Sequence, residues 1–97
     1  MALADPVRPE RAAVVDSLHR ARVNWELYYF ADAKTLKTFR KNPERYTGLV
    51  TDPVRLVRFM PTQESPRVER EGTLFFFATE ASRAEFLKSP DAYGRVR

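Results

Sequence analysis

A shift of 47 residues superimposes this chain on itself without a gap, and this internal repeat limits the fold more than any other feature of the sequence. The two copies are identical at 13 of the 42 positions from Asp5 to Tyr46. The longest identical stretch is Asp5-Pro6-Val7-Arg8, which recurs as Asp52-Pro53-Val54-Arg55. We therefore predict two copies of one supersecondary unit, in residues 4–47 and 51–94, joined by the short link 47–50.

Each copy contains a predicted β-hairpin. In the second copy, residues 65–71 alternate in polarity, Glu71-Gly72 forms a turn, and the aromatic stretch that ends at Phe77 is strongly β-prone. The first copy repeats this pattern as residues 17–23 and 26–30, with a turn near Asn24-Trp25 in which Trp25 replaces the glycine. In each triplet, Tyr28-Tyr29-Phe30 or Phe75-Phe76-Phe77, three successive strand residues cannot share one face. We expect the two copies to cover the remaining aromatic faces by packing against each other.

A helix is predicted after each hairpin. Asp32 and Thr79 are good N-cap residues, and the segments 33–41 and 80–88 are rich in helix formers and lack Gly and Pro. Asn42-Pro43 and Ser89-Pro90 then stop the helices and can begin a further turn that carries Tyr46 or Tyr93. Each copy is therefore predicted to be a ββα unit.

The size of the repeat predicts how the copies pack. A unit of roughly 43 residues is near the limit at which one core is insufficient without a metal or a disulfide. The chain has 97 residues and no cysteine, so disulfides and thiolate metal sites are excluded. We expect an α+β fold in which two tandem ββα units, residues 1–47 and 48–97, form one compact domain as a pseudo-twofold pair around the aromatic strands, Phe39 and Phe86.

The motifs of each copy resemble the YHS domain, a small metal-binding-type module with a treble-clef-like ββα fold. The second copy matches the family pattern through Asp52-Pro53-Val54, Ser65-Pro66, Gly72, Phe75-Phe76-Phe77, Phe86, Pro90 and Tyr93. The first copy matches it through Asp5-Pro6-Val7, Tyr28-Tyr29-Phe30, Phe39, Pro43 and Tyr46, and lacks the Ser-Pro step and the turn glycine. The resemblance spans almost the whole chain and implies the family's fold for each unit.

The cysteine ligands of the resembled family are absent from both copies. The family's three cysteine positions hold Arg8, Ala31 and Thr35 in the first copy and Arg55, Ala78 and Ser82 in the second. Ala, Thr and Ser are close to Cys in volume, so Thr35 can still pack one helical turn from Phe39, as Ser82 can from Phe86. Arginine, in contrast, places a positive charge where the family has a thiolate. We expect the scaffold without bound metal and without any other cofactor.

Catalysis and nucleic-acid binding are not predicted by these residues. His19 is the only histidine, and the acidic residues form no recognisable acid–base constellation, so we expect no enzyme activity. The net charge of +4 is spread over both copies, and we interpret the basic helix residues Lys34, Lys37, Arg40 and Lys41 as a solvated face. No apolar run approaches the roughly 18 residues of a membrane-spanning helix. The sequence leaves the cellular compartment open.

One asymmetry between the copies indicates a binding surface. The run Val54–Met60 carries five apolar residues and two arginines, and it has no apolar counterpart at Arg8–Ala13. We predict that the extra apolar residues form an edge strand or a partner surface, with candidates Leu56, Val57, Phe59 and Met60. The hypothesis is a non-catalytic binding or assembly module whose partner is another protein or a second copy of the chain. The alternative, from the family's usual role, is a metal-responsive or metal-carrying accessory protein that uses non-thiol ligands.

Overall fold

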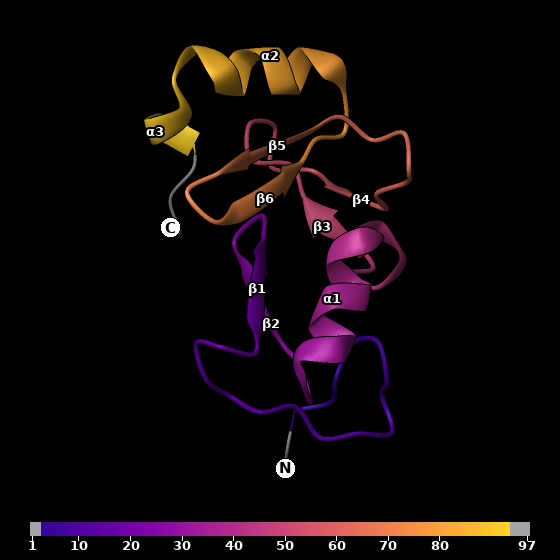
Figure 1. Cartoon of the computed structure of the whole chain (residues 1–97). Helices are drawn as coiled ribbons and strands as arrows, with labels where there is room; N and C mark the ends of the chain where they lie inside the picture. The colour runs from indigo at the N-terminus through magenta and orange to yellow at the C-terminus, as the bar shows by residue number, and fades with distance from the viewer. Residues whose placement is uncertain (1–2, 94–97) are drawn as a thin grey trace.

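The computed structural model describes residues 3–93, a mixed α+β structure with two sheets (Figure 1). In chain order the elements are β1 (Arg20–Val23), β2 (Glu26–Tyr29), α1 (Ala33–Lys41), the 3-10 helix η1 (Pro43–Arg45), β3 (Val50–Thr51), β4 (Arg58–Phe59), β5 (Arg67–Arg70), β6 (Thr73–Phe76), α2 (Glu80–Lys88) and α3 (Pro90–Tyr93). The elements β1, β2 and α1 recur 47 residues later, with the same lengths, as β5, β6 and α2. We call the part before Gly48 the first unit and the part from Gly48 onward the second unit.

Both predicted helices are confirmed with their caps. The Asp32 carboxylate accepts the Thr35 N–H at the start of α1, and the Thr79 hydroxyl accepts the Ser82 N–H at the start of α2. The helices end at Asn42 and Ser89, directly before the two prolines. Within residues 3–93, no helix has the length and apolar character needed to span a bilayer. Local sequence signals therefore account for both hairpins and both helices.

The four-stranded sheet joins the two units in the order β2-β1-β6-β5. Both hairpins are antiparallel, but the central pair is parallel and joins Arg22 to Thr73 and Val23 to Leu74. A twofold axis would pair equivalent strands, β1 with β5 or β2 with β6. The observed pair joins the first strand of one unit to the second strand of the other, so the units are arranged head to tail. The predicted pseudo-twofold packing is therefore not confirmed.

The aromatic strands contribute to two separate hydrophobic cores. Phe75 and Phe77 pack on Phe86 of α2, with ring centroids 5.0 and 5.2 Å apart. Phe76 points to the opposite face and is completely buried in the core of the first unit, beside Val23 and other apolar residues. Packing between the copies thus covers the second aromatic face in the second triplet, as the sequence predicts, whereas Tyr29, the equivalent of Phe76 in the first triplet, is only half-buried. Phe39 and Phe86, however, lie in different clusters and do not form a common centre.

Asn24, at the tip of the first hairpin, anchors the first unit in the second. It is 3% exposed, and its backbone N–H donates to the Leu74 carbonyl at 2.7 Å. Its side-chain Nδ2 donates to the carbonyls of Thr51 (2.6 Å) and Phe76 (3.2 Å), and its Oδ1 accepts the Phe76 N–H at 2.9 Å. These bonds satisfy backbone groups that would otherwise be buried without partners where the β1–β6 pairing ends. We call this set of contacts the Asn24 clamp.

Two further contacts tie the units together beside the clamp. The Trp25 indole N–H donates to the Tyr93 carbonyl at 3.2 Å, and the Trp25 ring packs against the core of the second unit. The Arg67 guanidinium lies 3.7 Å from the carboxylate of Glu44, whose side chain is only 9% exposed, and 4.6 Å from the centre of the Phe76 ring. Figure 1 shows the first hairpin reaching upward to the strands that α2 covers. The tip of one hairpin therefore carries much of the contact between the units.

We predict that Asn24→Ala lowers the free energy of unfolding by about 3 kcal/mol, because it leaves the Phe76 N–H and two carbonyls buried without partners. The matched control is Glu71→Ala. Glu71 occupies the same position of the second hairpin, at φ 51° against 54° for Asn24, but is exposed. Urea unfolding followed by circular dichroism measures both variants. Equal destabilisation by the two substitutions would show that the clamp contributes nothing beyond turn conformation.

Candidate functional site

Asp5 is a buried carboxylate that joins the start of the first unit to its helix. It is 0% exposed. Its Oδ1 accepts the N–H groups of Val7 and Arg8 at 2.8 and 3.1 Å. Its Oδ2 accepts the Ala31 N–H at 2.7 Å and the Thr35 hydroxyl at 2.6 Å. Asp5 therefore does more than shape a local turn: it cross-links three separate segments of the chain.

Asp52 repeats this arrangement in the second unit, with one contact fewer. It is also 0% exposed and accepts the N–H groups of Val54, Arg55 and Ala78 at 2.8, 2.9 and 2.8 Å. The Ser82 hydroxyl lies 3.3 Å from that of Thr79 instead of bonding to the aspartate. The equivalence of the two aspartates shows that the repeat extends to the polar interior.

Five of the six positions that the resemblance assigns to cysteine donate hydrogen bonds to these two aspartates, and Ser82 is the exception. Backbone or side-chain donors of Arg8, Ala31 and Thr35 contact Asp5, and backbone donors of Arg55 and Ala78 contact Asp52. Thr35 and Ser82 are buried, as their predicted packing one turn from Phe39 and Phe86 requires, and the Arg8 and Arg55 side chains are exposed. Each aspartate is thus the shared acceptor for the donors at these positions.

These residues do not fit a metal ion. The Asp5 oxygens are already bound by four donors, and the surrounding groups are N–H donors, hydroxyls and methyl groups in place of thiolates. Residues 3–93 contain no group of three or more His, Asp or Glu side chains placed to hold a metal. We derive no metal chemistry from this site.

The ionisation of Asp5 links this site to pH. Burial by itself raises the pKa of Asp5, but the hydrogen bonds from Ala31, Thr35, Val7 and Arg8 outweigh burial and hold the pKa below its ordinary value of 3.8. The folded state therefore binds protons less readily than the unfolded state at Asp5. The stability that this carboxylate contributes is present above pH 3.8 and is lost as the pH falls through its folded-state pKa.

We predict that Asp5→Asn lowers the free energy of unfolding by about 2–3 kcal/mol at pH 7 and reduces the loss of stability below pH 4. The amide keeps the size of the carboxylate but turns an NH₂ group toward donors. Urea unfolding at pH 7, 4 and 3 tests both effects, and Asp52→Asn serves as the matched variant in the second unit. An unchanged acid dependence in Asp5→Asn would contradict the assignment of acid sensitivity to this carboxylate.

The predicted partner surface lies on the hairpin formed by β3 and β4. The ladder pairs Val50 with Phe59, and these two side chains face the core of the first unit. Phe59 thus belongs to the inner face of the hairpin. The other three predicted residues are exposed, by 53% for Leu56, 48% for Val57 and 58% for Met60. With Leu49, which is 48% exposed, they make residues 49–60 an apolar hairpin on the surface of the molecule.

Leu56 adopts an unusual backbone conformation at the tip of the apolar hairpin. Its φ is 61°, in the left-handed region, where a leucine costs roughly 1–2 kcal/mol. Its N–H donates to the Asp52 carbonyl, and the Asp52 N–H donates to the Val57 carbonyl, both at 2.9 Å. The buried Asp52 carboxylate therefore anchors a strained turn that exposes two apolar side chains.

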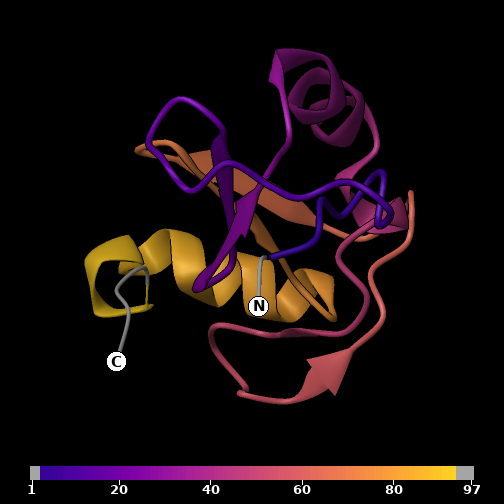
Figure 2. The same ribbon diagram turned by 90° about the horizontal axis from the view of Figure 1, so that it is seen from below.

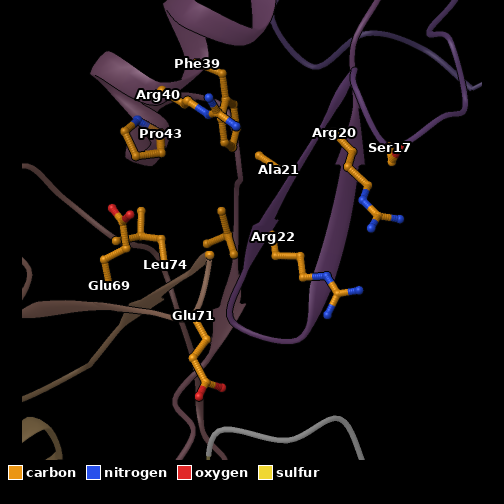
Figure 3. Close-up of a pocket in the computed structure, with 12 residues that line it drawn as sticks. Ser17, Arg20, Ala21, Arg22, Phe39, Arg40, Pro43, Glu69, Glu71 and Leu74 are labelled. Carbon is orange, nitrogen blue, oxygen red and sulfur yellow. The ribbon is translucent and has the colours of Figure 1, made fainter.

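A cavity of about 550 Å³ lies between α1, β1 and the turn of the second hairpin. Figure 3 shows Arg20 and Arg22 on one side of β1 and Arg40 beside Phe39 and Pro43 on the helix side. Among the described residues, no carboxylate lies within 4.0 Å of these three guanidinium groups, although Glu69 and Glu71 also line the cavity. The cationic groups point to different sides, so they do not form a convergent anion site.

The remaining titratable cluster has a structural role. The His19 Nδ1 lies 2.7 Å from the Asp16 Oδ1, which also accepts the N–H groups of Leu18 and His19. The hydrogen bond from His19 is the largest cause of a lowered pKa at Asp16. This pair closes a turn at the surface.

Sequence reasoning missed two features of this architecture. A carboxylate that bonds N–H groups two and three residues ahead is a sufficient local explanation for an Asp-Pro step, so the sequence does not show that Asp5 and Asp52 also accept the N–H groups of Ala31 and Ala78. Sequence reasoning also treated Asn24 only as part of a turn. The available signal was a difference between the copies: Asn24-Trp25 corresponds to Glu71-Gly72, although the first residue of both turns has a left-handed φ, 54° at Asn24 and 51° at Glu71.

Comparison of the chain with protein-family models, curated proteins and solved structures finds no match. The resemblance to the YHS family therefore stays a prediction from the residues themselves.

Proposed function

We propose that this protein is a non-catalytic, YHS-like binding module that uses its apolar hairpin to bind another protein chain. The single observation that carries the proposal is the exposure of Leu49, Leu56, Val57 and Met60 within one twelve-residue hairpin. Clustered apolar exposure of this kind is typical of interaction surfaces.

The difference between the two units supports this proposal. By the repeat, Leu56 and Val57 correspond to Pro9 and Glu10, and Met60 corresponds to Ala13. The loop of the first unit keeps the aspartate anchor without the apolar side chains. The scaffold therefore does not require these side chains, which argues for a role outside folding.

The rigidity of the apolar hairpin also favours recognition. Asp52 holds its turn through five hydrogen bonds from or to residues 54–57 and 78, and Phe59 fixes it to the core. A pre-organised loop loses less conformational entropy on binding than a mobile one. Retaining an exposed leucine in a strained conformation is typical of functional loops.

We predict that the double substitution Val57→Asp and Met60→Asp abolishes binding while leaving the fold intact, because both side chains are about half exposed. The immobilised wild-type chain is incubated with a lysate of the cells that produce it, and captured proteins are quantified by mass spectrometry. Leu87→Asp is the matched control, because Leu87 is 49% exposed on α2. Light scattering tests whether the partner is a second copy.

The following outcomes decide the proposal. Proteins captured by the wild type and by Leu87→Asp but lost with the double variant support it, as does self-association with the same dependence. Capture that is insensitive to the double substitution contradicts it, and so does a monomer that captures nothing. Stoichiometric binding of Zn²⁺, Cu²⁺ or Ni²⁺ with a rise in Tm would instead favour the alternative of a metal-carrying accessory protein.

We also predict that Leu56→Gly raises the free energy of unfolding by up to about 1 kcal/mol, because glycine adopts a φ of 61° without steric cost. The same substitution weakens partner binding, because it removes an apolar contact. Thermal unfolding and the capture assay measure the two effects on one variant. A clear loss of stability in Leu56→Gly would mean that the leucine side chain serves the fold.

A further inference from the structure

Because the units are arranged head to tail, only one of two equivalent strand edges is used between them. The edge of β6 in the second unit pairs with β1, whereas the equivalent edge of β2 in the first unit pairs with no strand among the described residues. In the second unit, the outer edge of β6 receives β1 and the Asn24 clamp, which bonds to the backbone of Leu74 and Phe76. This contact buries Phe76 completely. By the repeat, β2 corresponds to β6, Leu27 to Leu74 and Tyr29 to Phe76.

The outer edge of β2 is open in the part of the chain that the structure describes. In the sheet order β2-β1-β6-β5, β2 pairs only with β1. The Phe30 N–H donates to the His19 carbonyl, so the alternation of an antiparallel ladder turns the backbone groups of Leu27 and Tyr29 away from β1. Leu27 is 42% exposed and Tyr29 is half-buried. The outer edge of β2 thus presents backbone donors, backbone acceptors and apolar side chains. It is equivalent to the edge of β6 that pairs with β1.

The second hairpin of another copy does not have the residues needed to fill this edge. In the occupied interface, Val23 is buried in the core, Asn24 forms the clamp, and Trp25 packs on the neighbouring unit. The equivalent residues of the second hairpin are Arg70, Glu71 and Gly72. A glutamate has no donor for the two carbonyls that Asn24 Nδ2 reaches, and a charged strand end resists pairing with an apolar edge. With these residues, the second hairpin is not expected to add to the β2 edge of another copy.

We propose that the outer edge of β2 binds a β-strand of another protein in parallel, and that this strand ends in a turn with the pattern apolar residue, asparagine, aromatic residue. The strand adds to the sheet beside Glu26 and Leu27, the positions that correspond to Thr73 and Leu74 in the occupied interface. The asparagine amide bonds the backbone of Tyr29. Arg58 of the apolar hairpin lies 3.8 Å from Glu26, but the edge of β2 shares no residue with the exposed apolar side chains of that hairpin, so either proposal can fail without the other.

To test the proposal, the three residues at the tip of the second hairpin are replaced by those at the tip of the first. The triple substitution Arg70→Val, Glu71→Asn and Gly72→Trp copies the clamp sequence onto the exposed turn of the second unit. We expect analytical ultracentrifugation to show self-association of this variant at least tenfold tighter than any shown by the wild type. Adding Leu27→Lys, which puts a charge on the receiving edge, reverses the gain. A folded triple variant that sediments as the wild type overturns the proposal, as does association that Leu27→Lys leaves unchanged.

A second measurement uses the wild-type chain and covers the case in which the triple variant does not fold. A synthetic peptide with the sequence of residues 19–27, which includes the Val23-Asn24-Trp25 turn, is titrated into the ¹⁵N-labelled wild-type protein. We expect chemical-shift changes at the amides of Leu27 and Tyr29, and none with a peptide in which alanine replaces the asparagine. Changes confined to Leu74 and Phe76, or no change at millimolar peptide, overturn the proposal.

Discussion

The amide of Asn24 is the interaction on which the arrangement of this molecule depends. It lies at the point where the parallel pairing of β1 with β6 stops, and it supplies the hydrogen bonds that the missing strand residues would have made. The clamp joins the tip of the first hairpin to the edge of the second hairpin, at β6. The two units therefore contact each other through different surfaces. The head-to-tail order of the sheet, the burial of Phe76 and the position of Trp25 all follow from this contact.

The two buried aspartates show how a unit of this size folds without a thiolate cluster. A short ββα unit needs a device that ties its opening turn to the start of its helix, because its core is small. Here that device is a carboxylate, with four donors at Asp5 and three at Asp52. Charge-assisted hydrogen bonds are stronger than neutral ones, and they hold the separate segments together from within the protein. Packing of the two units against each other buries further apolar surface, including that of Phe76.

Sequence reasoning reached everything in the fold that local signals encode. The caps Asp32 and Thr79, the stops at Pro43 and Pro90 and the alternation of the aromatic strands act within a few residues, and the helices begin and end where these signals place them. The relation between the units was not accessible in the same way, because two equal copies suggest a symmetric pair. The asymmetry resides in Val23, Asn24 and Trp25, whose counterparts are Arg70, Glu71 and Gly72. For the candidate surface, the apolar contrast between the copies located the hairpin, but only the ladder register shows that Phe59 faces inward.

Native-state hydrogen exchange of the Phe76 amide tests the central claim most directly. The Phe76 N–H points away from β5, so it cannot bond within the β5–β6 ladder. Among the described residues, its acceptor is the Asn24 Oδ1 of the clamp. We expect the Phe76 amide to exchange only through global unfolding, at the same free energy as the best-protected amides of the β5–β6 ladder. Exchange of Phe76 at a much lower free energy, with that ladder still protected, would show that the units separate without unfolding and would contradict that claim.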